Sequence, residues 1–405
     1  MKYNNPRKQF INYAAINFLF YITQSLGGYV TVFLQSIGFN AQQVGVITAL
    51  NSGVGIFSSP FLGMLSDKIR SVRKVILFAL ICGASLFVLI PLSSKYDING
   101  LSLLFILIPI ATFFRMPVMS LTDNWMLRNS TAEKLNYGAL RSFGAFSFAS
   151  ASLALGYILP ITGIDFTFYA YAILTVPAII MIRYVKSGAD EQNTNKKALT
   201  FKEMQVGQIF KNFYLVSHIL FSVFQRIPFQ CSMIFLPFLI NEIGGDTAQI
   251  GIVMGVRAFV EIPMMLLLKP LRQKIPLYYL VIAASFFYMV ESILYSYANS
   301  FSNIVLVSIL HGFGNGLNLT AGTSYVFSLA PDHLKATAQT VLGSMSSIAG
   351  ILGGLSGGVL ITIFGIQKFY FVIGIMIMIA LVLYILSFFI GEKVLGIKRP
   401  GLSTG

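Results

Sequence analysis

Twelve long apolar stretches, separated by short polar loops, constrain the fold of this chain more than any single motif does. A helix needs about 20 apolar residues to cross the hydrocarbon core of a bilayer. Hydrophobic residues make up 56% of the 405 residues and charged residues only 10%, whereas a soluble domain carries about 25% charged residues. Each stretch is therefore predicted to be a membrane-spanning helix. The predicted spans are residues 10–35, 43–66, 73–93, 101–127, 138–160, 164–184, 212–238, 248–268, 277–297, 303–329, 337–362 and 368–391.

The positions of the basic residues predict how these spans are oriented. The net charge is +14, and lysines and arginines gather at both ends of the chain and after the even-numbered spans. The loops after odd-numbered spans hold only Lys95 and Lys368. Because basic loops stay in the cytoplasm, both termini are expected there. The compact loops and the absence of an organelle-targeting signal favour the plasma membrane of a bacterium. Basic residues placed in this way do not indicate a nucleic-acid partner.

One long polar segment, SGADEQNTNKKALTFKE, divides the spans into two sets of six. The predicted domains are an N-terminal six-helix bundle at 1–186, a cytoplasmic linker at 187–211 and a C-terminal six-helix bundle with a short tail at 212–405. Spans five and eleven are both rich in small residues, which let helices approach closely in lipid. The predicted fold class is all-α integral membrane, with two six-helix bundles in a 6+6 pseudo-repeat around a central cavity. A single bundle with unrelated further helices is the alternative.

The loop between spans two and three reads GMLSDKIRSVRK, starting at Gly63. Gly63 permits close packing at the end of its span, and Asp67 can cap a helix N-terminus or pair with an arginine. The loop resembles the signature of the major facilitator superfamily, G-x-L-(S/A)-D-(R/K)-x-G-R-(R/K), with Arg70 in place of the second glycine. That resemblance implies transport by alternating access. It also implies a gating role for Gly63, Asp67, Lys68 and Arg73.

Ionisable residues within spans four and five predict a binding site. An ion near the bilayer centre costs about 2.5–3.5 kcal/mol on insertion scales, so it usually faces a cavity or a partner. Span four holds Arg115 and Asp123, and span five begins with Arg141, seven residues before Phe148. On adjacent antiparallel helices, Asp123 and Arg141 can hydrogen-bond hydroxyl groups while the Phe148 ring packs against a sugar. The alternative is a salt bridge that only joins two helices.

The same region, from TDNWM through YGALRSFGAFSF, resembles spans four and five of the oligosaccharide:proton symporters of the lactose-permease type. In that family an acid and an arginine eighteen residues apart bind the galactoside, and an aromatic residue seven positions later stacks against it. Asp123, Arg141 and Phe148 have that spacing, with aspartate for the glutamate of the family and phenylalanine for its tryptophan. We expect Arg115 to belong to the same binding site.

Spans eight and ten hold a second set of polar residues. Arg257 and Glu261 lie four residues apart on one helix face, where Glu261 is either a proton site or half of a structural pair. His311, in LHGFGNGLNL, matches a histidine of the lactose-permease type, but Gly314 replaces the carboxylate that this family uses for coupling. Asn315 is a candidate substrate ligand. These spans also resemble the phenylpropionate and nucleoside permeases. The predicted proton-coupling residues are Asp123, Arg257, Glu261 and His311.

The leading hypothesis is a secondary transporter that takes up a small polar organic solute, with a sugar or glycoside favoured, by proton symport. The proton gradient is the expected driving force, with no cofactor. Cys82 and Cys231 lie in separate apolar runs, which argues against a metal cluster, and no catalytic set indicates an enzyme. The alternatives are uptake of nucleosides or aromatic acids, export of amphiphiles or drugs, and a membrane sensor. We expect a monomer in the lipid bilayer, with a small-molecule substrate as its partner and with Glu291 in a structural role.

Overall fold

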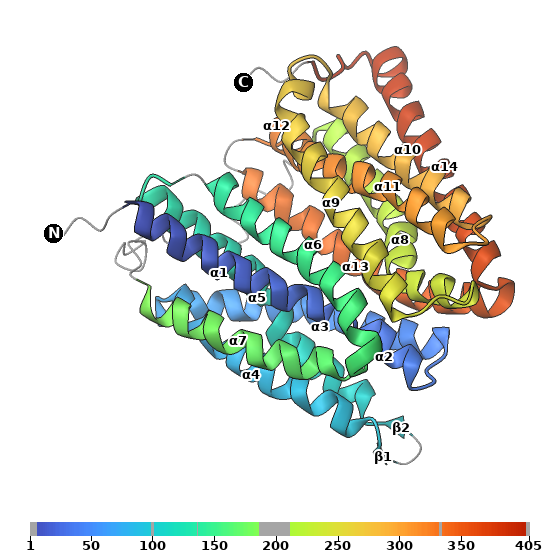
Figure 1. Ribbon diagram of the computed structural model, residues 1–405. Coiled ribbons are helices and arrows are strands. Elements are labelled where there is room, and N and C mark those ends of the chain that lie inside the picture. The colour runs from blue at the N-terminus through green and yellow to red at the C-terminus, as the bar shows by residue number, and fades with distance from the viewer. Residues whose placement is uncertain (1–5, 99–100, 136, 186–210, 332–333, 402–405) are drawn as a thin grey trace. The chain divides into compact units, whose positions relative to one another are not determined.

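The computed structural model describes residues 6–98, 101–135, 137–185, 211–331 and 334–401. Long helices make up nearly all of the described chain (Figure 1). Eleven of these described helices are long and apolar enough to cross a membrane, and they match the second to twelfth predicted spans. The first predicted span is divided into a long and a short helix at Gly28 and Tyr29, because consecutive glycines disfavour a continuous helix.

The helix bounds follow the predicted spans within a few residues. The first half contains α1 (Pro6–Gly27), α2 (Val30–Ser36), α3 (Ala41–Ile69), α4 (Val72–Ser93), α5 (Leu104–Ala132), α6 (Tyr137–Thr162) and α7 (Phe166–Tyr184). The second half contains α8 (Phe213–Glu242), α9 (Thr247–Arg272), α10 (Leu277–Tyr295), α11 (Phe301–Leu317), η2 (Asn318–Gly322), α12 (Thr323–Leu329), α13 (Lys335–Phe364), α14 (Ile366–Phe389) and η4 (Ile390–Val394). A two-residue antiparallel pair, β1 (Asp97–Ile98) with β2 (Leu101–Ser102), lies between α4 and α5.

The chain forms two compact units. The first unit comprises Met1–Asn40, Leu50–Asn195 and Asp246–Gly255, and the second comprises Ala41–Ala49, Lys196–Gly245 and Val256–Gly405. In the first unit α1 packs against α6 and α7, and α4 packs against α5 and α7. In the second unit α8 packs against α13 and α14, and α10 packs against α11 and α14. The same set of helix pairings therefore recurs in both halves, as the predicted pseudo-repeat requires. The linker predicted at 187–211 lies outside the described residues, apart from Lys211.

Buried aromatic and polar side chains hold α1 in the first unit. The rings of Tyr13 and Trp125 meet edge to face with centroids 5.9 Å apart. The buried Asn17 amide donates a hydrogen bond to the Leu140 carbonyl at 3.1 Å, which joins α1 to α6. A hydrogen bond buried in apolar surroundings fixes the register of the two helices, since breaking it leaves polar groups unsatisfied.

The loop that resembles the superfamily signature differs from one of our predictions, and the prediction for the Asp67 side chain stays untested. A Cβ added at Gly63 would meet no described atom within 4 Å, so the close packing predicted there is wrong. The N-cap of α4 is Ser71, whose side chain accepts a hydrogen bond from the Lys74 amide at 3.3 Å. Asp67 lies within α3 and does not occupy that cap position, and its side chain lies outside the described ones.

Two arginines of this loop have defined structural positions. Arg70 has φ 55°, a left-handed conformation that suits the glycine found in the superfamily signature. Arg73 donates a hydrogen bond from Nη1 to the carbonyl of Val185 at 2.9 Å, so it ties the start of α4 to the end of α7. Lys68 is exposed. The gating roles of these residues remain predictions.

Candidate substrate and coupling sites

The polar cluster of the first unit is centred on the carboxylate of Asp123 in α5. Nε of Arg141, from α6, lies 3.8 Å from Oδ1 of Asp123. The hydroxyl of Tyr21, from α1, donates to the same carboxylate, with distances of 3.2 Å and 3.4 Å to its two oxygens. Tyr137 also hydrogen-bonds Asp123. Three helices thus bring an acid, a base and phenol groups together within the apolar bundle.

The Asp123–Arg141 ion pair is only partly covered. Each side chain is 30% exposed, and ion pairs that remain accessible contribute only about 0–1 kcal/mol to stability. A carboxylate can accept about four hydrogen bonds and a guanidinium can donate five. The pair therefore keeps hydrogen-bonding capacity for a ligand, and stability alone is a weak reason for these ions to lie in this span.

Tyr21 provides the aromatic ring at this ion pair. The guanidinium carbon of Arg141 lies 4.2 Å from the centre of the Tyr21 ring, within the range of a cation–π contact. Gly144 leaves space for the ring, because a Cβ at that position would lie 2.9 Å from Cε2 of Tyr21. Phe148, which was expected to form the aromatic plate, packs half-buried against the hydrophobic core of the first unit. Sequence reasoning missed Tyr21, although a tyrosine in the middle of span one was a detectable signal.

Arg115 lies eight residues before Asp123 in α5 and has a different environment. Its guanidinium carbon is 5.3 Å from the centre of the Phe87 ring. Gly27 makes room for it, since a Cβ there would lie 2.7 Å from Cζ of Arg115. No carboxylate among the described residues forms an ion pair with it. The structure does not join Arg115 to the Asp123 cluster, and its binding role remains a prediction.

The second unit contains a buried charge network around Glu291 in α10. Nη2 of Arg257 lies 2.8 Å from Oε1 of Glu291 and donates to the Tyr295 hydroxyl at 2.9 Å. Nδ1 of His311 lies 3.1 Å from both carboxylate oxygens of Glu291. Arg257, Glu291 and His311 are 5%, 2% and 3% exposed. The ion pair therefore joins Arg257 of α9 to Glu291 of α10. Sequence reasoning missed Glu291 as the partner of Arg257.

Glu261 belongs to a second, more open group of side chains, which adjoins the first where the ring centres of Tyr288 and His311 lie 5.7 Å apart. The Asn315 amide donates to Oε2 of Glu261 at 2.8 Å, and the Tyr288 hydroxyl donates to Oδ1 of Asn315 at 3.0 Å. Glu261 and Asn315 are both half-buried. A neutral amide therefore bridges the carboxylate of α9 and the phenol of α10.

The glycines of LHGFGNGLNL explain how α9, α10 and α11 come so close. A Cβ at Gly312 would lie 2.9 Å from the Arg257 carbonyl, and one at Gly316 would lie 2.8 Å from the Glu261 carbonyl. On another side of α11, a Cβ at Gly314 would lie 3.0 Å from Cε1 of Tyr288. An acidic side chain at position 314 would therefore collide with the Tyr288 ring. The carboxylate that contacts His311 is that of Glu291, which lies in α10.

Comparison with known proteins agrees with this architecture. The sequence matches the MFS_1 like family over residues 10–373. The uncharacterized transporter YwbF of Bacillus subtilis is 27% identical over 316 residues, covering 76% of this chain and 75% of that one. The maltose permease of Geobacillus stearothermophilus is 23% identical over 334 residues, 81% of each chain. The solved structure of the nucleoside transporter NupG has a TM-score of 0.77 at 16% identity, covering 94% of this chain and 99% of that one, which shows the shared fold. The chain therefore belongs to the MFS_1-like family and is a multi-pass membrane transporter of the major facilitator type, not an enzyme.

Proposed function

We propose that this transporter moves a small polar organic solute, with a sugar favoured, across a bacterial plasma membrane by alternating access. The observation that supports this proposal is the Asp123–Arg141 ion pair, whose two side chains are each 30% exposed. A paired carboxylate and guanidinium with free hydrogen-bonding capacity suit hydroxyl groups, and the adjacent Tyr21 ring suits the apolar face of a sugar. The similarity to a maltose permease supports the same substrate class.

We further propose that transport is proton-coupled uptake by a monomer with both termini in the cytoplasm, and that Glu261 carries the proton. Glu261 is half-buried and its carboxylate accepts a hydrogen bond from a neutral amide, whereas Glu291 is 2% exposed and holds Arg257 at 2.8 Å. An exchangeable proton needs a site that water can reach, and Glu261 is the more accessible of these two acids. In this proposal the network of Arg257 and His311 around Glu291 supports α9, α10 and α11.

The experiment is transport by the purified full chain in liposomes, with maltose, other sugars, nucleosides and aromatic acids offered under an imposed pH gradient. We expect saturable uptake of a sugar, accompanied by alkalinisation outside the vesicles. Arg141→Ala and Asp123→Asn are expected to reduce uptake by at least about tenfold, since each removes charge-assisted hydrogen bonds to the solute. Asp165→Asn is the matched control, because Asp165 is an exposed acid of the first unit that makes no cap hydrogen bond.

Each part of the proposal has its own contradicting result. Binding of a sugar without flux would favour the sensor alternative, and flux of nucleosides alone would replace the substrate class. Undiminished transport by Arg141→Ala would reject the site. For coupling, Glu261→Gln is expected to retain exchange of labelled solute across the membrane while losing uphill accumulation. Accumulation that is as steep as in the unmodified protein would reject Glu261 as the proton carrier.

A further inference from the structure

Arg115 brings a positive charge into the first unit that the Asp123 cluster does not use. It is half-buried near the middle of α5, a 29-residue helix. Its guanidinium contacts the Phe87 ring of α4 and interacts electrostatically with the hydroxyl of Tyr171 in α7, but with no described carboxylate. A single cation–π contact offsets only part of the cost of keeping an ion within a bilayer. Such an ion usually faces a partner or a path for solutes.

The guanidinium of Arg115 also keeps its hydrogen-bonding capacity. No hydrogen bond joins its three nitrogens to a described residue, and none of the three is sealed from accessible space. Helices α1, α4 and α7 lie around the side chain, through Gly27, Phe87 and Tyr171. The accessible part of the guanidinium therefore opens into the interior of the first unit.

A second unused donor lies on α1, at Gln24. Along this helix Gln24 lies one turn from Gly27, which makes room for the guanidinium, and one turn from Tyr21 on the other side. The Nε2 of Gln24 is buried and has no hydrogen-bond partner among the described residues. A buried amide nitrogen normally has an acceptor. Two donors without acceptors thus lie near each other, and such a pair suits an anion.

The spacing of these groups suits a solute longer than one sugar ring. Tyr21, which donates to Asp123, and Gly27 are six residues apart on α1, about 9 Å along the helix axis. Asp123 and Arg115 are eight residues apart on α5, about 12 Å along its axis. A disaccharide has a length of this order, so one solute can reach the Asp123 cluster with one ring and Arg115 with the other end.

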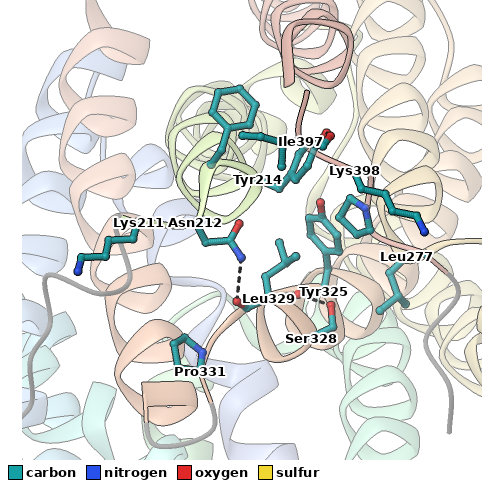
Figure 2. Close-up of a pocket in the computed structure, with 13 residues that line it drawn as sticks. Lys211, Asn212, Tyr214, Leu277, Tyr325, Ser328, Leu329, Pro331, Ile397 and Lys398 are labelled. Atoms are coloured by element: carbon teal, nitrogen blue, oxygen red, sulfur yellow. Dashed lines mark hydrogen bonds between the residues drawn. The ribbon is translucent and has the colours of Figure 1, made fainter. Parts of the chain in front are cut away.

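A cavity in the second unit does not have these features. It has a volume of about 780 Å³ and lies where α8 and α10 begin and α12 ends (Figure 2). Lys211 and Lys398 point away from it (Figure 2), and the hydroxyl of Tyr325 in its wall is hydrogen-bonded to that of Tyr384. This cavity therefore does not offer the unpaired donors that lie within the first unit.

We propose that Arg115 and Gln24 bind a carboxylate of the transported solute, while the Asp123–Arg141 pair binds its hydroxyl groups. The solute is accordingly a sugar acid of about two rings. Arginine suits a carboxylate because its planar guanidinium donates two parallel hydrogen bonds to the two oxygens. This inference rests on the proposed function, since it takes the Asp123–Arg141 pair as the first point of contact with the solute.

The test compares sugar acids with neutral sugars that differ from them at one carbon. Maltobionate is paired with maltitol and lactobionate with lactitol, because each acid has a carboxylate where its neutral partner has a hydroxymethyl group. Binding to the purified full chain in lipid nanodiscs is measured by isothermal titration calorimetry. We expect the protein to bind the acid of at least one pair at least about tenfold more tightly, since the neutral sugar lacks the charge-assisted contact with Arg115.

Three variants test the residues of this site. Arg115→Gln should raise the Kd of the acid at least about tenfold and change that of the neutral sugar less than about threefold. Gly27→Ala keeps the arginine but places a Cβ 2.7 Å from its Cζ, so it should displace the guanidinium and weaken binding of the acid. Gln24→Leu should weaken binding of the acid about two- to tenfold, the effect of one hydrogen bond. Arg183→Gln, which changes an exposed arginine at the end of α7, is the matched control and should keep the preference for the acid.

The preference is a ratio between two ligands of one sample, so partial misfolding does not change it. Equal affinity for both members of both pairs, no saturable binding of either acid, or a preference that survives Arg115→Gln would overturn the proposal. Arg226 of α8 is another half-buried arginine that no described carboxylate pairs with. Loss of the preference in Arg226→Gln, but not in Arg115→Gln, would place the carboxylate in the second unit and also overturn it.

Arg141→Ala tests the proposed function separately. This variant should weaken binding of the acid and of the neutral sugar alike, since it removes hydrogen bonds to hydroxyl groups that both ligands have. Unchanged binding of both ligands, with the preference for the acid intact, would reject the Asp123–Arg141 site and leave the carboxylate site at Arg115 in place.

Discussion

Replacement of Glu291 by glutamine is expected to lower the free energy of unfolding by about 3–5 kcal/mol, the usual loss when one member of a buried ion pair is removed. Glu291 is 2% exposed, and its Oε1 lies 2.8 Å from Nη2 of Arg257, which is 5% exposed. The neutral glutamine amide leaves the buried guanidinium of Arg257 hydrogen-bonded to the Tyr295 hydroxyl but without a counter-ion. Since about 1.4 kcal/mol changes an equilibrium tenfold, folding should be weakened by about two to four orders of magnitude.

The assay is reversible unfolding of the full chain in mixed micelles, titrated with a denaturing detergent and followed by far-ultraviolet circular dichroism. Glu261→Gln is the matched control, because it makes the same chemical change to a half-buried acid. Glu261 accepts a hydrogen bond from the neutral amide of Asn315, so we expect a loss of about 1.5–3 kcal/mol, the usual contribution of a hydrogen bond to a charged group.

A double-mutant cycle separates the ion pair from simple loss of packing. Arg257→Met combined with Glu291→Leu removes both charges and keeps most of the volume. Replacing a buried ion pair by apolar side chains of similar volume often leaves stability unchanged or increases it. The free energy of unfolding of the double variant should therefore lie within about 2 kcal/mol of that of the unmodified protein. Losses from the two single changes that simply add in the double variant would refute the reasoning.

Four further outcomes follow from local geometry. Tyr21→Phe removes the hydrogen bond to Asp123 but keeps the ring, so the KM for the transported solute should rise about two- to tenfold while the free energy of unfolding changes by less than about 1 kcal/mol. Arg70→Gly relieves a residue with φ 55°, so it should raise the free energy of unfolding by about 0.5–1 kcal/mol, whereas Arg70→Ala should give no gain. Gly312→Ala places a Cβ 2.9 Å from the backbone of α9 and should destabilise the protein by about 1–3 kcal/mol in the same titration. Gly63→Ala faces open space and should instead stabilise α3 by up to about 1 kcal/mol.

The membrane spans could be predicted because the length of an apolar run is a property of the sequence alone. The first span shows the limit of that argument. Apolar residues continue through Gly28, but the glycines there allow the chain to leave the helix, and hydropathy does not register this. The meeting of Asp123 and Arg141 was also predictable, because the short connection between α5 and α6 keeps the adjoining ends of the two helices close together.

The remaining partners of the site depend on packing between helices that are distant in sequence. Tyr21 lies 102 residues before Asp123, and its place at the ion pair requires α1 to pack on α6. Gly144 marks the position where the ring fits, but a glycine in a sequence does not identify which side chain fills the space beside it. The spacing of Arg257 and Glu261 on one helix face likewise gave no information about Glu291, because α10 reaches Arg257 only through the tertiary fold.

We propose different roles for the two carboxylates beside α11. Glu291 neutralises a buried guanidinium and contacts His311, so protonating it in each transport cycle would repeatedly leave Arg257 without its counter-ion. In the proposed coupling role Glu261 gains and loses the proton, since its side chain is half-buried and is more accessible to water than that of Glu291. Glutamine substitutions should therefore separate the two functions: the change at Glu291 should act mainly on folding, and the change at Glu261 should act on coupling in a protein that still folds. If Glu261→Gln unfolds the protein as strongly as Glu291→Gln does, the half-buried position of Glu261 does not distinguish it from Glu291, and the proposed division of roles is wrong.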